Sequence, residues 1–175
     1  MPVVSSLLDS IECLPDMKLL IADDSKMQRK LLAKILESLG HDVIAVANGA
    51  RALTKFHEDP CDVLFTDWDM PELDGLQLAE QIRQHHAGAH VFIIMLSAIY
   101  VLKENLYQAV NNGVNDFLKK PYTKRDIFVR LRLAESHLKA QFEIRELRRE
   151  RDYFKEQFEK LRNPHKKAFR AIRDK

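Results

Sequence analysis

Four short polar motifs, each placed directly after an apolar run, constrain the fold of this chain more than any other feature. They are Asp23-Asp24, Thr66-Asp67-Trp68-Asp69-Met70-Pro71, Ser97-Ala98 and Lys120-Pro121. The apolar runs are short enough to be buried strands, and amphipathic stretches of helix length separate them. Because ligands bind at the carboxyl ends of parallel strands, we expect the four motifs to meet at one edge of a sheet.

Strand and helix patterns alternate from Lys18 onward, which predicts an α/β fold with five βα units. The expected strands are 18–22, 42–46, 62–66, 91–96 and 115–118. The expected helices are 26–39, 50–58, 75–85, 102–112 and a last one from about Thr123. This order is typical of a five-stranded, parallel, doubly wound sheet.

The last helix is too long for the domain that it completes. No Pro or Gly occurs between Thr123 and Arg162, and the next helix breaker is Asn163-Pro164. About 39 residues at 1.5 Å each make a rod of roughly 60 Å, about twice what a domain of this size can cover. We therefore expect the second half of the helix to project from the domain.

A heptad pattern in this segment predicts a parallel homodimeric coiled coil. Its seam is formed by Leu133, Ala140, Ile144, Leu147, Phe154, Phe158 and Leu161, with polar His137 and Arg151 at two a positions. The same frame pairs Glu143 with Arg148 and Glu150 with Lys155 of the partner helix, as g and e residues. A solvated charged helix with coincidental periodicity is the alternative.

Composition indicates one core and one appendage in 175 residues. We expect an N-terminal arm at 1–16, either loose or packed on, an α/β domain at 17–132, a coiled coil at 133–162 and a basic tail at 163–175. Residues 1–137 hold 15 Lys/Arg against 19 Asp/Glu, a net charge of −4, whereas residues 138–175 hold 13 against 7, a net charge of +6. The two parts are therefore expected to do different jobs.

Cellular location is predicted from what the sequence lacks. Cys13 and Cys61 form no metal or disulfide pattern and are interpreted as reduced thiols. The start has no basic region typical of a signal peptide, and no apolar run approaches the roughly 18 residues of a membrane span. These features predict a soluble cytoplasmic protein that does not insert into membranes.

The motifs also predict a chemistry. Asp23, Asp24 and Asp67 would repel one another at one sheet edge unless a cation intervened, and hard oxygen ligands favour Mg²⁺. Beside Mg²⁺, an aspartate can act as a nucleophile toward phosphorus. Lys120 would bind a phosphoryl oxygen, and the hydroxyl of Ser97 would donate to another.

Taken in order, the motifs resemble the receiver domain of two-component response regulators over residues of about 17–137. The resemblance rests on the whole set: Leu20-Ile21-Ala22-Asp23-Asp24-Ser25, Asp67-Trp68-Asp69-Met70-Pro71-Glu72-Leu73-Asp74-Gly75, Met95-Leu96-Ser97-Ala98 and Asn115-Asp116-Phe117-Leu118-Lys119-Lys120-Pro121. It implies a flavodoxin-like fold and a regulatory protein rather than an enzyme. It also implies a phosphoryl donor, either a sensor histidine kinase or a phosphotransfer protein.

The resemblance assigns a role to each matching position. Asp67 would be the phosphoacceptor, Asp23 and Asp24 the acid pocket, and the backbone carbonyl of Asp69 a further Mg²⁺ ligand. Lys120 would contact the phosphoryl group. Ser97 and Phe117 would be the switch pair, with Phe117 rotating inward when Ser97 moves toward the phosphoryl group.

Other residues near the motifs have simpler interpretations. Seen alone, Asp23-Asp24 could be a helix cap and a surface acid, and Asp74-Gly75 is expected to cap a helix. Trp68 is expected to be an aromatic residue at the rim of the site. His85, His86 and His90 are expected to form a solvated turn rather than a metal cluster.

The output of such a regulator is open at this point. We favour a dimer that controls a partner protein through its last helix, or the regulatory half of a longer protein such as a cyclic-dinucleotide enzyme. The alternatives are a DNA-binding regulator that uses the basic C-terminal helix, which lacks base-reading side chains, and a hydrolase, for which no substrate cap is evident.

Overall fold

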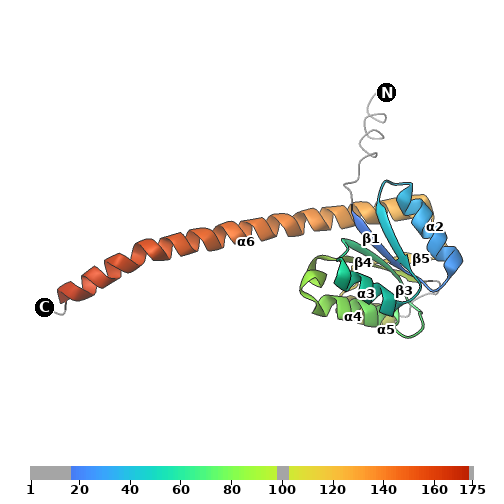
Figure 1. Cartoon of the computed structure of the whole chain (residues 1–175), viewed down its shortest axis with the longest axis horizontal. Coiled ribbons are helices and arrows are strands. Elements are labelled where there is room, and N and C mark those ends of the chain that lie inside the picture. The colour runs from blue at the N-terminus through green and yellow to red at the C-terminus, as the bar shows by residue number, and fades with distance from the viewer. Residues whose placement is uncertain (1–16, 98–102, 174–175) are drawn as a thin grey trace, which may run out of the picture. The chain divides into compact units, whose positions relative to one another are not determined.

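The computed structural model describes residues 17–97 and 103–173 and shows one five-stranded parallel sheet in the order β2-β1-β3-β4-β5 (Figure 1). Its strands are β1 (Lys18–Ala22), β2 (Asp42–Val46), β3 (Val63–Asp67), β4 (Phe92–Ser97) and β5 (Asp116–Lys119). The register pairs Leu20 with Ile44 on one side and with Leu64 on the other. The chain order therefore reverses between β1 and β3, where a doubly wound sheet binds its ligands.

Helices connect the strands and cover both faces of the sheet. They are α2 (Lys26–Glu37), α3 (Gly49–Glu58), α4 (Gly75–Gln84), the short 3₁₀ helix η1 (His86–His90), α5 (Lys103–Asn111) and α6 (Lys124–Arg173). The side chains of Ser25, Asn48 and Asp74 accept hydrogen bonds from the first turns of α2, α3 and α4. Capping therefore fixes where these helices begin.

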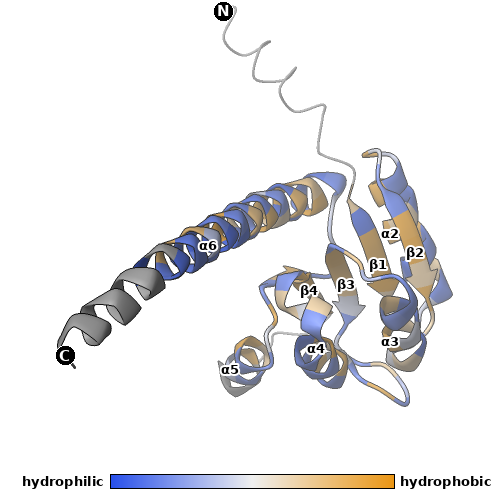
Figure 2. Cartoon of the chain, turned by 60° about the vertical axis from the view of Figure 1, so that its left-hand side comes forward, coloured by the Kyte–Doolittle hydropathy of each residue, from blue (hydrophilic) through white to orange (hydrophobic). Residues whose placement is uncertain are grey.

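The core has two layers because side chains alternate across the strands. On one face, Leu20 and Leu64 pack with Phe56 of α3 and Leu78 of α4. On the other face, the core is formed with α2 and the first turns of α6 by residues that include Leu19, Ile21, Phe65, Leu32, Leu36, Ile127 and Leu131. Figure 2 shows the hydrophobic colour concentrated on the strands between helices of mixed character. Burial on both faces is typical of a parallel sheet.

The predicted sheet is confirmed, and every described strand and α-helix through β5 begins and ends within two residues of the predicted bounds. The short 3₁₀ helix η1 occupies the segment that was expected to be a turn. One prediction is wrong. Asn163-Pro164 does not end the last helix, since α6 continues to Arg173. A proline inside a helix removes one backbone donor, and strong helix formers such as Lys, Glu and Ala on both sides hold the flanking turns.

The chain divides into two compact units, residues 1–138 and 139–175. Side chains of α6 pack on the sheet as far as Leu138, whose own side chain is partly buried there. The second unit consists of the later part of α6 and the residues after it. Within the described residues, no helix is both long enough and apolar enough to cross a membrane.

Candidate functional site

The chain brings its polar motifs to the carboxyl edge of the sheet. Asp23 follows the last residue of β1, Asp67 is the last residue of β3, and Lys120 follows the last residue of β5. Because neighbouring parallel strands are held in register, their ends lie side by side. The expected meeting of these motifs is what the structure shows.

Lys120 links two of the carboxylates. Its Nζ lies 2.9 Å from Oδ2 of Asp23 and 2.8 Å from Oδ2 of Asp67. The Asp23 side chain is only 1% exposed, whereas that of Asp67 is 15% exposed. Asp67 is therefore the carboxylate of this pair that a reactant in solvent can reach more easily.

Backbone contacts hold Asp23 and Asp24 in place. The amide of Ser25 donates to Oδ1 of Asp23 at 2.9 Å. The guanidinium of Arg29 donates to the backbone carbonyl of Asp23, and to that of Asp24 at 3.2 Å. The sequence interpretation missed Arg29. The sequence feature that could have indicated this role of Arg29 is its position, one turn into the helix that directly follows the acidic pair.

Asp67 is held by the loop that follows it. The amide of Trp68 donates to Oδ1 of Asp67 at 2.8 Å, and the amide of Gly75 donates to the carbonyl of Trp68 at 3.0 Å. A Cβ added at Gly75 would lie 2.2 Å from the carbonyl oxygen of Asp67, so only glycine fits there. Asp74 caps α4, as predicted, and the structure adds that the cap is a reciprocal pair with Gln77.

The three acidic side chains fit a hard cation. Carboxylate oxygens of Asp23, Asp24 and Asp67 all lie within 4.8 Å of one another. An all-oxygen donor set with one exposed member, Asp24, leaves room for bound water, which is the coordination that Mg²⁺ prefers. The side chain of Asp69 is exposed, and its backbone carbonyl remains a predicted ligand.

The electrostatics of the site reflect burial and mutual repulsion. Burial raises the pKa of Asp67, and the neighbouring charge of Asp23 raises it further, although Lys120 acts in the opposite direction. For Lys120, burial lowers the pKa, but the hydrogen bonds to Asp67 and Asp23 outweigh it and the pKa is raised. Burial raises the pKa of Tyr122 to about 12, with smaller contributions from Asp23 and Asp67. Because its pKa is raised, Lys120 is charged at neutral pH.

The two predicted switch residues lie on the strands beside Asp67. Ser97 is buried at the end of β4, and its carbonyl accepts a hydrogen bond from the backbone amide of Lys120 at 2.8 Å. Phe117 of β5 is half-buried, and its ring stacks on that of Trp68 with centroids 6.5 Å apart. Trp68 was predicted to be a rim residue, and its contact with Phe117 could not be predicted from sequence spacing. Residues 98–102, which follow Ser97, lie outside the described residues.

The histidines form a cluster of rings. The ring centroid of His85 lies 4.1 Å from that of His86 and 5.2 Å from that of His57. Nδ1 of His85 accepts a hydrogen bond from the amide of Ala87 and so helps to begin η1. Among residues 17–97 and 103–173, the Asp23, Asp24 and Asp67 group is the only arrangement of metal-ligating side chains with suitable spacing.

A carboxylate cluster with a lysine, at the carboxyl edge of a doubly wound parallel sheet, defines the receiver class of signalling domains. The sequence model of the response regulator receiver domain family matches residues 19–132, and the chain belongs to this family. It is therefore a CheY-like receiver domain of two-component signalling. Such domains are regulatory proteins rather than classical enzymes, and they bind Mg²⁺ at an acidic pocket.

Individual relatives agree with this assignment. The chain is 40% identical over 111 residues to a CheY chemotaxis homologue of Campylobacter jejuni, a match that covers 61% of this chain and 83% of the relative. Among solved structures, Vibrio cholerae CheY4 aligns with a TM-score of 0.66 at 25% identity and covers 69% of this chain and 99% of its own. The receiver domain of a sensor histidine kinase from Pseudomonas aeruginosa PAO1, described with magnesium in its active-site cleft, aligns with a TM-score of 0.64 at 27% identity, covering 70% and 99%.

Proposed function

We propose that Asp67 accepts a phosphoryl group from a sensor histidine kinase or a phosphotransfer protein. The observation that carries this proposal is the contact of 2.8 Å between Asp67 and Lys120, inside a group of three carboxylates. Asp67 is the member of the Asp23–Lys120–Asp67 cluster that combines contact with the lysine and partial exposure. It is therefore the residue that an incoming phosphoryl group would reach.

Each neighbouring side chain has a role in this transfer. An Asp67 oxygen forms the new bond to phosphorus as the bond between phosphorus and the donor nitrogen breaks. The ammonium group of Lys120 moves from pairing with Asp67 to binding an oxygen of the phosphoryl group. Asp23, Asp24 and Asp67 would hold Mg²⁺, which offsets the negative charge that develops during transfer. The amide of Trp68 orients the Asp67 carboxylate.

Incubation with a small-molecule acyl phosphate and Mg²⁺ tests the proposal. Intact mass spectrometry should find one phosphoryl group on the wild-type chain and none on Asp67→Asn. Asp42→Asn, an exposed aspartate at the start of β2, is the matched control and should be labelled like wild type. Equal labelling of Asp67→Asn would refute the assignment of the phosphoacceptor. Chelation of Mg²⁺ should slow labelling.

The donor protein is proposed to dock beside α2. This helix begins directly after the acidic pair, and its Met27 and Leu31 are exposed although they are large and apolar. Exposed apolar side chains next to a reactive group are typical of an interaction surface. Docking there would bring a phosphohistidine to the open side of Asp67.

We propose that phosphorylation changes the arrangement of Ser97 and Phe117 and thereby the pairing of α6. The stacked rings of Phe117 and Trp68 connect β5 to the residue that follows Asp67. Phosphorylation adds negative charge and acceptor oxygens at this point, and a donor hydroxyl such as that of Ser97 is expected to respond to them. The side chain of Phe117 would then repack on one face of β5, the strand next to β4 at the edge of the sheet, whose other face is covered by α6.

The exposed stripe of α6 supports the proposed parallel homodimer. Ile144, Leu147, Phe154 and Phe158 are between 43% and 66% exposed, and Leu133 and Ala140 on the same stripe are exposed as well. Such a row of large apolar residues is stabilised when a second helix covers it. The side chain of Leu161 lies outside the described residues, and Arg151 binds Asp152 of the same helix. In this proposal, a cytoplasmic dimer passes the signal to a partner protein or to an output domain of a longer chain.

A further inference from the structure

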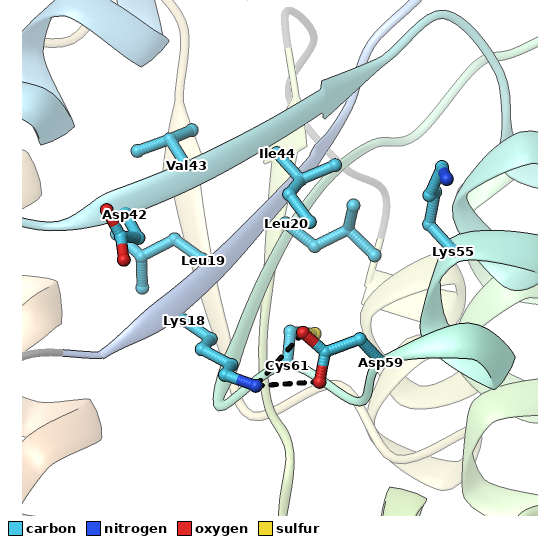
Figure 3. A pocket seen from close by; sticks show the side chains of 9 residues that line it. All are labelled: Lys18, Leu19, Leu20, Asp42, Val43, Ile44, Lys55, Asp59 and Cys61. Carbon is cyan, nitrogen blue, oxygen red and sulfur yellow. Dashed lines mark hydrogen bonds and ion pairs between the residues drawn. The ribbon is translucent and has the colours of Figure 1, made fainter.

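A groove opens at the amino ends of β1 and β2, at the opposite end of the sheet from Asp67 (Figure 3). Its volume is about 350 Å³, and its lining comes from β1, β2, the end of α3 and the loop after α3. The lining residues are Lys18, Leu19, Leu20, Asp42, Val43, Ile44, Lys55, Asp59 and Cys61. Pockets of this size hold several apolar side chains.

The groove has an apolar floor and a charged rim. Leu20 and Cys61 belong to the core layer on the α3 side of the sheet, and Ile44 beside them is 43% exposed. Figure 3 shows the ion pair between Lys18 and Asp59, with Nζ and Oδ1 2.7 Å apart, beside Cys61. Since β2 is an edge strand, this apolar surface lies next to unpaired backbone groups that proteins usually cover.

We propose that residues 5–14 of the same chain fill this groove. These residues lie outside the described ones, but the described chain enters β1 at Met17 and Lys18, and Lys18 lines the groove. The segment supplies four large aliphatic side chains in a short span, Leu7, Leu8, Ile11 and Leu14. A tether of only a few residues gives them a high effective concentration at the groove, which favours this occupant over a separate molecule.

The chain length permits this arrangement. The backbone amide of Asp62 donates to the carbonyl of Lys18 at 2.9 Å, and the amide of Lys18 donates to Oδ2 of Asp62 at 2.9 Å. Cys61 therefore lies beside the start of β1. Lys18 lies five positions after Cys13 in the chain, and five residues of extended chain span up to about 17 Å. A docked arm thus places Cys13 within reach of Cys61.

Oxidative trapping tests this contact. In the full chain at low concentration, copper-phenanthroline should form an intramolecular Cys13–Cys61 disulfide that Cys13→Ser abolishes. The matched control is Cys61→Ser with Ala45→Cys. Ala45 is exposed on the edge strand β2, where it is paired with Ile21, and it does not line the groove, so Cys13 can reach it equally well only if the arm is undocked. The control thiol should trap at least about tenfold more slowly.

Labelling of Cys61 provides a second measurement that does not depend on disulfide geometry. In a Cys13→Ser background, deletion of residues 2–14 should raise the rate at which a thiol reagent labels Cys61 about tenfold, because the covering segment is lost. Equal trapping at the two thiol positions, or a labelling rate that the deletion leaves unchanged, would overturn the proposal. Disulfides that form only between two chains would overturn it too, and would give the groove to the arm of a second copy. Phosphorylation of Asp67 is not involved in either readout.

Discussion

At the scale of single residues, the folded chain holds more negative than positive side chains at the site, and their mutual repulsion is unfavourable. Three carboxylates share one edge of the sheet with one lysine, and Lys120 contacts both Asp23 and the partly buried Asp67. Burial and the charge of Asp23 raise the pKa of Asp67, which means that its ionised form is less favourable in the folded chain than in water. A cation therefore meets a site whose ionised acids are not fully compensated.

Asp67→Asn is expected to stabilise the protein at neutral pH. A carboxyl group whose pKa is raised by folding contributes to the free energy of unfolding in full below its unfolded pKa of 3.8. That contribution is lost as the pH rises through the pKa of the folded state. An amide cannot ionise, so the variant should exceed wild type in free energy of unfolding by on the order of 1 kcal/mol at pH 7. The difference should shrink as the pH falls toward 3.8.

Urea unfolding between about pH 4 and pH 8 measures this difference, with Asp42→Asn as the control for loss of an exposed carboxylate. Mg²⁺ should raise the stability of wild type more than that of Asp67→Asn, because a ligand that binds only the folded state stabilises it. A variant that is less stable than wild type at pH 7 would contradict the proposed charge balance.

At this scale, some of the site could be read from the sequence and some could not. Asp23, Asp67 and Lys120 each come directly after or at the end of a recognisable strand, so their meeting follows from parallel topology. The stacking of Trp68 on Phe117 depends on rotamers of residues 49 positions apart, and no pattern encodes it. Arg29 was missed because a surface helix usually carries basic residues without a specific role.

At the scale of elements, the start of α4 is coupled to the phosphoacceptor through one glycine. Gly75→Ala places a methyl group 2.2 Å from the carbonyl oxygen of Asp67, so either α4 or the end of β3 must move. We expect a loss of about 2–4 kcal/mol in stability and a slower phosphorylation of Asp67. Gln77→Ala, which weakens the cap of the same helix without a clash, should cost only about 1 kcal/mol. Equal effects of the two changes would contradict the coupling.

The element patterns also show why α6 was the least predictable helix. Hydrophobic alternation and helix caps are local signals, and they located the strands and helices of the receiver domain closely. The stop at Asn163-Pro164 was wrong because one proline costs about 3 kcal/mol, which long favourable flanks can offset. The proposed pairing of α6 depends on a second chain. The sequence indicates that pairing only through the apolar stripe on the helix.

The seam of α6 gives a prediction at the same scale. Leu147→Lys puts a charge in the middle of the apolar stripe and should convert a dimer into a monomer, with a loss of affinity of at least about 100-fold. Glu146→Lys introduces the same residue on an adjacent position outside the seam, where Glu146 pairs with Arg149, and should leave the dimer intact. Light scattering over a range of concentrations measures both. Dimers of equal strength would rule out this seam.

At the scale of the whole molecule, the receiver domain and the distal part of α6 communicate only if phosphorylation and pairing have a coupling free energy. A long helix that begins in the core of the receiver, with Ile127 and Leu131 buried, gives the two parts a shared element. Coupling of this kind is reciprocal, because each event must shift the other by the same factor at equilibrium. That reciprocity makes the connection testable from both ends.

From one end, beryllofluoride, a mimic of the phosphoryl group, should change disulfide formation between two copies of Leu147→Cys in a background without native cysteines, Cys13→Ser and Cys61→Ser. The same cysteine variant with Asp67→Asn should not respond. From the other end, the monomeric Leu147→Lys should bind the mimic with an affinity that differs from that of wild type, measured well above the dimer dissociation constant, by a factor of typically about 5–150. Because each dimer holds two sites, the mimic should shift the dimerisation constant by the square of that factor. Unchanged pairing and unchanged affinity together would show that Asp67 does not act through the pairing of α6, and the surface that carries the stacked Phe117 and Trp68 would be the next one to test.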